Sequence, residues 1–360
     1  MHSHTHSKIV LTPLVHQQYL ASQALGLQYL VVNAHKTFYT YINGWADYQQ
    51  RSPMRASTTM MGYSMTKTFT AVAILQLVGV GSLGLDDDIA TVLPAPAYAG
   101  QRITVRQLLC HTSGLPNPIP LRWVHLATEH AQFDEEAALA QVLRKHSSLK
   151  SKPGHSYAYS NIGYWLLGKI IERITGHTYT DYVAQHILQP LGLSDRDLGF
   201  AMANPALHSK GYLAKYSALN LLKAWVTDSK LWGPYEGDWL TLKNHYANGP
   251  AFGGLVGTAH GFAQLLQDQL RQSSVLLSFQ NQQLLQTQQT NSRGALVPMT
   301  LGWHIGHKND MPYLFKEGGG GGFHSEMRLY PQLGIGTIVM ANSTTFNSTR
   351  FLNHTDNVFF

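Results

Sequence analysis

A serine and a lysine lie three residues apart, at Ser64 and Lys67, where an extended run at 59–63 gives way to an apolar stretch. In a helix this spacing places both side chains on one face, with Cβ atoms about 5 to 6 Å apart. A serine hydroxyl becomes nucleophilic when a neighbouring base takes its proton, and a lysine becomes such a base when burial lowers its pKa. The apolar neighbours, among them Met61 and Phe69, predict that burial. The pair therefore indicates acyl transfer through Ser64, with backbone N–H groups at the helix start available for a developing oxyanion.

The same S-x-x-K spacing occurs a second time, at Ser147 and Lys150. That pair lies in a polar segment leading into a Pro-Gly turn at 153–154, so no buried face is expected to lower the pKa of its lysine. Ser64 is therefore the preferred nucleophile.

Tyr159 and Asn161 form a second candidate element, directly before the apolar stretch 162–171. A tyrosine near a cation can relay a proton, and an asparagine amide can orient a lysine and bind a substrate carbonyl. Two other Tyr-x-Asn triplets, at 41–43 and 246–248, share the pattern. The triplet alone therefore does not select a site.

Lys316 opens a third element, in which Glu317 leads into five consecutive glycines at 318–322. Extended backbone alternates faces, so Lys316 and Gly318 are expected on one side and Glu317 on the other. A strand without side chains lets a ligand approach the backbone, and a nearby lysine adds positive potential. A flexible glycine loop between two strands is the simpler alternative.

Together the three elements resemble the penicillin-recognising serine hydrolase superfamily, especially its branch of class C β-lactamases, D,D-peptidases and family VIII esterases. The order and context match: S-x-x-K at a helix start, Y-S-N far downstream and K-x-G on a late strand. Further phrases similar to that branch are spread along most of the chain, among them LLCHTSGL at 108–115, PLG at 190–192 and GGLVGT at 253–258.

The resemblance implies that Ser64 is the acylated nucleophile and Lys67 its activating partner. It implies that Tyr159 is the proton relay and the base for deacylation, and that Asn161 steadies Lys67 and the acyl chain. The third element supplies Lys316, which by the resemblance sets the electrostatic field around Tyr159.

The resemblance also assigns substrate binding to Gly318 and Gly319, with the backbone N–H groups of Ser64 and Gly319 as the oxyanion hole. Many relatives carry Thr or Ser where this chain has Glu317, whose negative charge disfavours an anionic substrate. A small ester is therefore the favoured substrate, ahead of a β-lactam or an acylated D-amino peptide. A non-catalytic relative that serves in sensing or assembly is the alternative.

Strand patterns at both ends of the chain and helical patterns between them predict an α+β fold with one antiparallel sheet. The expected strands are 27–33, 37–42, 301–305, 322–330 and 334–341. Residues 1–85 and 250–360 are predicted to form an α/β sheet domain flanked by helices, and 86–249 an inserted, mainly helical domain. The active site is expected in the groove between them, with loops 117–123 and 198–248 shaping the substrate pockets.

Other kinds of site are less well supported. His111 and His324 lie near the candidate elements, but a structural role is the favoured interpretation of both. The stretch 163–169 nearly spells a phosphate-binding loop, yet Ile170 replaces the required Ser or Thr. Because no spacing typical of a metal site such as H-E-x-x-H occurs, we expect no metal and no cofactor.

Composition narrows the class of partner. The chain has 360 residues, and its 26 Lys and Arg against 20 Asp and Glu are scattered rather than clustered, so a nucleic-acid partner is not expected. The uncharged stretch 68–85 contains Gln76 and several glycines and indicates a buried helix rather than a transmembrane segment. Cys110 is single and cannot form an internal disulfide.

The first seven residues alternate histidine with polar residues and indicate a mobile tail or a cloning remnant rather than a targeting peptide. A signal peptide removed earlier would make the protein periplasmic or secreted, and otherwise it is expected to be cytoplasmic. The sequence indicates no oligomeric state.

Overall fold

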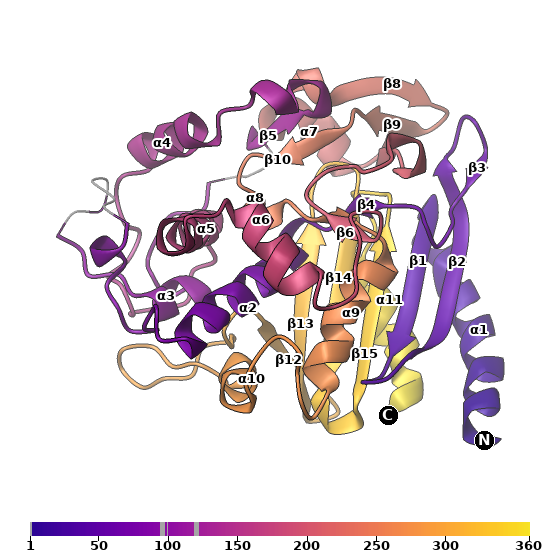
Figure 1. The fold of residues 1–360 in the computed structure, drawn as a ribbon. Coiled ribbons are helices and arrows are strands. Elements are labelled where there is room, and N and C mark those ends of the chain that lie inside the picture. Colours follow the sequence, from indigo (N-terminus) through magenta and orange to yellow (C-terminus); the bar gives the residue numbers. More distant parts are fainter. Residues whose placement is uncertain (1, 94–97, 99, 119–121) are drawn as a thin grey trace.

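A seven-stranded antiparallel sheet joins the two ends of the chain (Figure 1). The computed structural model describes residues 2–93, 98, 100–118 and 122–360, so part of the predicted pocket loop 117–123 lies outside the described residues. The strand order is β12-β13-β14-β15-β1-β2-β3. These strands are β1 (Gly26–Val32), β2 (Thr37–Asp47), β3 (Ser52–Pro53), β12 (His304–Lys308), β13 (Met311–Gly319), β14 (His324–Tyr330) and β15 (Ile335–Ala341). Because β1 pairs with both β2 and β15, the predicted α+β fold with both chain ends in one antiparallel sheet is confirmed.

Helices cover both faces of this sheet, which explains why β1 is buried along its whole length. One face packs against α9 (Ala259–Leu270) and, beyond it, α2 (Thr66–Gly79). The other face packs against α1 (His2–Ser22) and α11 (Ser348–Thr355). The sheet therefore forms a rigid middle layer.

The N-terminal segment is helical, whereas its first seven residues were predicted to form a mobile tail. Residues 2–22 form the helix α1, and Leu11 and Val15, one helical turn apart, are buried against the aromatic side chains Tyr29 and Tyr39 of the sheet. The prediction covered only the first seven residues and missed the apolar anchor that follows them.

The central helix α2 is largely apolar because it is enclosed by the rest of the protein, and it ends at Gly79, within the stretch 68–85 that was predicted to form a buried helix. It packs against α5 (Asn161–Thr175) and α8 (Pro250–Gly253). Within the described ranges, no helix combines the length and the apolar character needed to cross a membrane.

Between residues 86 and 249 the chain contains the predicted helices and also several strands that were not predicted. The helices here are α3 (Val105–Leu109), α4 (Glu135–Lys145), α5, α6 (Tyr179–Val183, continued by a π-helix at Ala184–Leu188) and α7 (Ala218–Val226). The strands are β5 (Val124–Leu126), β6 (Leu198–Gly199), β7 (Gly211–Ala214), β8 (Trp232–Glu236), β9 (Trp239–Leu242) and β10 (His245–Ala247). Strands β7, β9 and β8 make a small sheet of their own at one end of the molecule.

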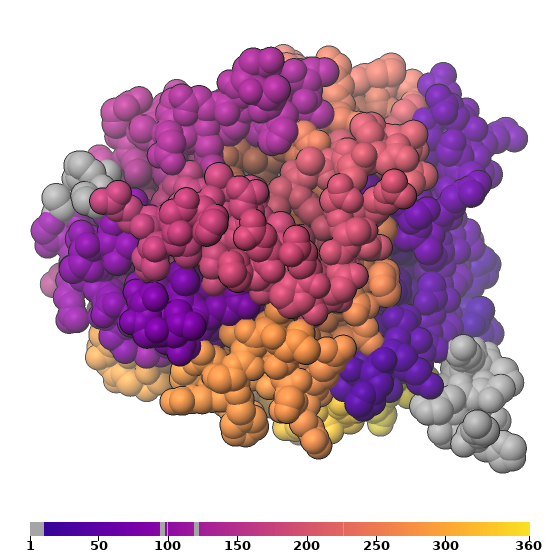
Figure 2. Space-filling model, viewed as in Figure 1, coloured from indigo at the N-terminus to yellow at the C-terminus, as the bar shows by residue number. Residues whose placement is uncertain are grey.

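Two short strands, β4 (Met60–Met61) and β11 (Val256–Gly257), pair beside the start of α2, and α10 (Phe279–Gln286) packs near its end. The predicted strand 301–305 begins later, at His304, because Gly302 has φ = 101° and lies against Ala71 of α2. In the space-filling view the residues of β1–β3 form one flank of the molecule and those of α4 and α5 the other (Figure 2).

Candidate active site

Ser64 lies in a short 3-10 turn, Tyr63–Met65, directly ahead of α2. Tyr63 has φ = 44°, a left-handed conformation that is uncommon for a bulky residue. Its hydroxyl donates a hydrogen bond to the carbonyl of Gly321 at 2.7 Å and lies 2.9 Å from Nε2 of His245. These contacts tie the strained turn to the glycine run and fix the position of Ser64.

Lys67 is fully buried, and its Nζ has three hydrogen-bond partners. These are Ser64 Oγ at 2.9 Å, Asn161 Oδ1 at 2.7 Å and the main-chain carbonyl of Phe252 at 2.6 Å. Burial, and then the charge of nearby Lys316, hold the Lys67 pKa well below its ordinary value. A neutral Lys67 can donate its two protons to Asn161 and Phe252 and direct its lone pair at the Ser64 hydroxyl.

Tyr159 contacts the same serine from the segment that directly precedes α5. Its hydroxyl donates a hydrogen bond to Ser64 Oγ at 2.8 Å, and burial raises its pKa above the ordinary value. The rings of His111 and His304 pack beside it, with centroids 4.3 and 6.0 Å away. The phenol is therefore held between aromatic rings and pointed at the serine.

Asn161 is the first residue of α5 and is oriented by Asn117. The backbone N–H and the side-chain Nδ2 of Asn161 both donate to Asn117 Oδ1, at 3.1 and 3.0 Å. The Oδ1 of Asn161 is thereby turned toward Lys67. Asn117 begins the predicted pocket loop 117–123, but no local pattern marks its contact with Asn161 or the contact of the Phe252 carbonyl with Lys67, because both arise only through the tertiary fold.

Lys316 is fully buried on β13, with Nζ 5.4 Å from the centroid of the Tyr159 ring. Its Nζ has no hydrogen-bond partner among the described residues, and burial lowers its pKa to about 7. Because a charged Lys316 favours the phenolate of Tyr159 and disfavours protonation of Lys67, its charge couples the two groups.

The glycine run follows β13 across the start of α2. A Cβ on Gly318 would lie 2.1 Å from the carbonyl oxygen of Gly62, and one on Gly320 would lie 2.4 Å from the Tyr63 ring. Gly319, on the opposite face, pairs with His324 and has no atom closer than 3.6 Å to an added Cβ. Lys316 and Gly318 are buried and Glu317 is exposed, so the predicted alternation of faces is confirmed.

Glu317 lies on the same face of β13 as Gly319, which lines the cleft at Ser64. Its Oε1 is 2.5 Å from Nε2 of His324, and this hydrogen bond lowers the pKa of the Glu317 carboxyl. The carboxylate therefore stays ionised beside the cleft. His324 contacts Glu317 rather than Ser64, and His111 accepts a hydrogen bond from the backbone N–H of Ser160, which fits a structural role for both histidines.

The cleft at Ser64 is narrow, with a volume of about 50 Å³. Its walls are mainly apolar and aromatic, and they include Trp123, Val124, Leu231, Leu242 and Phe252.

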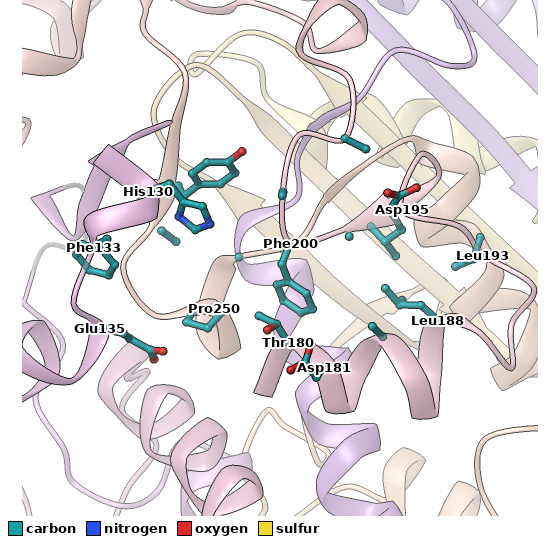
Figure 3. A pocket seen from close by; sticks show the side chains of 18 of the residues that line it. His130, Phe133, Glu135, Thr180, Asp181, Leu188, Leu193, Asp195, Phe200 and Pro250 are labelled. Atoms are coloured by element: carbon teal, nitrogen blue, oxygen red, sulfur yellow. The ribbon is translucent and has the colours of Figure 1, made fainter. Parts of the chain in front are cut away.

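A larger cavity of about 630 Å³ lies nearby, and Ser64 is not among its lining residues. Figure 3 shows His130 and Phe133 on one side of this cavity, Leu188 and Asp195 on the other, and Phe200 between them. Its lining includes Ala247, which also borders the Ser64 cleft.

The competing motifs lie elsewhere. Ser147 and Lys150 are exposed on the surface. Tyr41 contacts His16, and the Tyr246 hydroxyl accepts a hydrogen bond from the backbone N–H of Met202. In the part of the chain that the structure describes, no cluster of His, Cys, Asp or Glu is arranged to hold a metal ion.

The family of the chain follows from comparison with known proteins. A family model described as Beta-lactamase matches residues 14–357, so the chain belongs to the Beta-lactamase family. It is a β-lactamase-like member of the serine hydrolase superfamily that includes penicillin-binding proteins, amidases and esterases, and the resemblance seen in the sequence is confirmed.

Protein flp of Staphylococcus aureus (strain MW2) is 27% identical over 337 residues, an alignment that covers 91% of this chain and 62% of flp. The chain thus spans less than two thirds of that relative. The D-amino acid amidase from Ochrobactrum anthropi SV3 in complex with D-phenylalanine superposes with a TM-score of 0.76 at 20% identity, covering 97% of this chain and 98% of the amidase. EstCE1, a hydrolase with promiscuous acyltransferase activity, superposes with a TM-score of 0.71 at 22% identity, covering 97% and 98%. These two matches show a shared fold.

Proposed function

We propose that the protein is a serine hydrolase that forms an acyl-enzyme on Ser64 and that it cleaves small esters. The observation that carries the proposal is that Ser64 Oγ lies within hydrogen-bond distance of both Lys67 Nζ, at 2.9 Å, and the Tyr159 hydroxyl, at 2.8 Å. A buried amine and a phenol on the same serine hydroxyl provide both a base and an acid for acyl transfer.

In the proposed acylation, neutral Lys67 takes the proton of Ser64 as Oγ attacks the ester carbonyl. The carbonyl oxygen becomes an oxyanion, for which we propose the backbone N–H groups of Ser64 and Gly319 as donors. Tyr159 protonates the departing alcohol, and the Lys67 proton restores the phenol. In the proposed deacylation, the phenol of Tyr159 gives its proton to neutral Lys67 as it takes one from the attacking water. The bond between the acyl carbon and Ser64 Oγ then breaks, and the proton on Lys67 passes to Oγ, which leaves as the hydroxyl.

Electrostatics favour an uncharged substrate. The ionised Glu317 lies on the same face of β13 as the cleft residue Gly319, and its negative charge there disfavours a carboxylate of the kind found on a β-lactam or a peptide terminus. The narrow apolar walls favour a short acyl group. A β-lactam or a D-amino peptide remains the second candidate substrate, supported by the fold shared with a D-amino acid amidase.

The placement of the cleft also supports the proposed two-domain arrangement. Ser64 and the residues 319–321 come from the predicted sheet domain, whereas Trp123 and Asn161 come from the inserted region 86–249. We therefore propose that the groove between the two regions is the substrate site.

A hydrolysis panel tests the proposal. The substrates are short p-nitrophenyl esters, a chromogenic cephalosporin and D-Ala-D-Ala peptides. Hydrolysis of each is measured with the wild type, with Ser64→Ala and Lys67→Ala, and with the matched control Ser147→Ala. We expect the highest kcat/KM on the esters, loss of turnover in the first two variants and unchanged turnover in the control. Turnover that survives in folded Ser64→Ala would contradict the acyl-enzyme, and an inactive wild type on the whole panel would favour a non-catalytic relative.

A further inference from the structure

Helix α7 (Ala218–Val226) has its apolar face turned to solvent. Ala218, Leu221, Leu222 and Trp225 follow the i, i+3, i+4, i+7 spacing of a single helical face. In a globular protein that face normally packs on the core, yet Leu221 is 82% and Trp225 80% exposed. Tyr216, just before the helix, is exposed as well. These residues, Tyr216, Ala218, Leu221, Leu222 and Trp225, are called the α7 stripe below.

The polar side of the same helix holds it to the protein. Asn220 is buried, and its Nδ2 donates hydrogen bonds to the carbonyls of Ala214 at 3.3 Å and Lys215 at 3.0 Å. Lys223 donates to Asn220 Oδ1 at 2.6 Å and lies over the Trp232 ring. The helix is therefore anchored through buried polar contacts, and its orientation, with the stripe outward, is specified by those contacts.

The α7 stripe adjoins the Ser64 cleft. Thr227, the residue that follows α7, and Leu231 both line that cleft. At the same end, Arg122 donates hydrogen bonds to the carbonyls of Ala224 at 3.3 Å and Trp225 at 3.0 Å, and Trp123 next to it is another cleft residue. In Figure 1, α7 lies beside β5 and the β7-β9-β8 sheet, above the main sheet. A partner surface that covers the α7 stripe would therefore also lie beside the Ser64 cleft.

We propose that the α7 stripe docks on an anionic lipid surface and that the Ser64 cleft takes ester substrates held in that surface. This inference rests on the proposed esterase function. Exposed Leu and Trp side chains on one face of a surface helix are the residues that insert into the boundary between headgroups and acyl chains. Exposed cations flank the stripe at Arg122 and Lys215, and neither forms an ion pair with any described residue. With the net charge of +6, they favour anionic headgroups.

Binding is measured first, without catalysis. The full chain carrying Ser64→Ala is sedimented with vesicles of phosphatidylglycerol and phosphatidylcholine, alone and with Leu221→Gln plus Trp225→Gln. The matched control is Val80→Gln plus Phe279→Gln, which removes two similarly exposed apolar side chains at the other end of the molecule. We expect the stripe variant to bind at least about tenfold more weakly and the control to bind normally, because loss of buried apolar area weakens partitioning.

Turnover is measured second, with Ser64 restored. The stripe variant should hydrolyse soluble p-nitrophenyl acetate at the wild-type rate and lose about tenfold on the acetate ester of a long-chain alkylphenol, which keeps the acyl group short and holds the substrate in the vesicles. Equal vesicle binding by the stripe and control variants overturns the inference. A second outcome also overturns it: no form of the protein binds vesicles, and sedimentation velocity shows a wild-type dimer that is lost in the stripe variant. The stripe would then be covered by a second copy of the chain. Failure of the wild type on every soluble ester instead contradicts the proposed function and leaves the binding result standing.

Discussion

The structure predicts that Gly318 and Gly319, adjacent on β13, differ sharply in their tolerance of one added methyl group. A Cβ on Gly318 would lie 2.1 Å from the carbonyl oxygen of Gly62, whereas contacts below 3.0 Å are essentially never observed. The strand and the turn must therefore separate by about 0.9 Å, the difference 3.0 − 2.1. Gly62 lies two residues before Ser64, so this shift reaches the hydroxyl. Displacement by about 1 Å costs on the order of 100-fold in rate, and overpacking costs about 1 to 3 kcal/mol of stability.

The assay compares Gly318→Ala with Gly319→Ala by kcat/KM on p-nitrophenyl acetate and by thermal unfolding. A Cβ added at Gly319 would lie 3.6 Å from the nearest atom, which is an ordinary contact. Alanine at this position also keeps the backbone N–H for the proposed oxyanion hole. We expect about a 100-fold loss for Gly318→Ala and less than about a threefold change for Gly319→Ala. Equal kcat/KM values in the two folded variants would show that close packing at Gly318 does not position Ser64.

Three further outcomes are expected. Tyr159→Phe should accumulate acylated protein in a rapid quench followed by intact mass measurement, and free enzyme at steady state would argue against the relay. Burial lowers the pKa of Lys316 to about 7, so the unfolded chain binds more protons above that pH, and the free energy of unfolding should rise with pH from about 7 to 10.5. One such group contributes a slope of up to about 1.4 kcal/mol per pH unit. Urea titrations at several pH values should show a smaller slope in Lys316→Met, and an unchanged slope would contradict the lowered pKa of Lys316. Arg328→Met should cost about 3 to 5 kcal/mol, because it leaves buried Glu326 unpaired, and Glu326→Gln in the same chain should restore part of it; no destabilisation in urea would count against this.

The sequence was most informative where the chemistry lies within one turn of chain. Ser64 and Lys67 contact each other because helical spacing requires it, and the apolar flanks correctly predicted a buried lysine. The convergence of Tyr159 on Ser64 joins residues 95 positions apart, and only the resemblance of the ordered motifs suggested it. Local patterns cannot specify which distant segments pack together.

The remaining features depend on tertiary packing. The carbonyl of Phe252 contacts Lys67 because α8 packs against α2, a relation that no residue type marks. Strands β7 to β9 are short, β7 begins with Gly and β8 contains Gly and Pro, so their pattern is weak. The outward-facing stripe of α7 looks in sequence like any amphipathic helix, because periodicity does not say which face is buried.

The most direct test of the acyl-enzyme is to trap it. The protein is incubated with a fluorophosphonate, digested and analysed by peptide mass spectrometry, with Lys67→Ala as a parallel sample. We expect one modified peptide, labelled at Ser64, and slow or absent labelling in Lys67→Ala. An unlabelled Ser64 in folded wild-type protein, or a label at Ser147 instead, would contradict it.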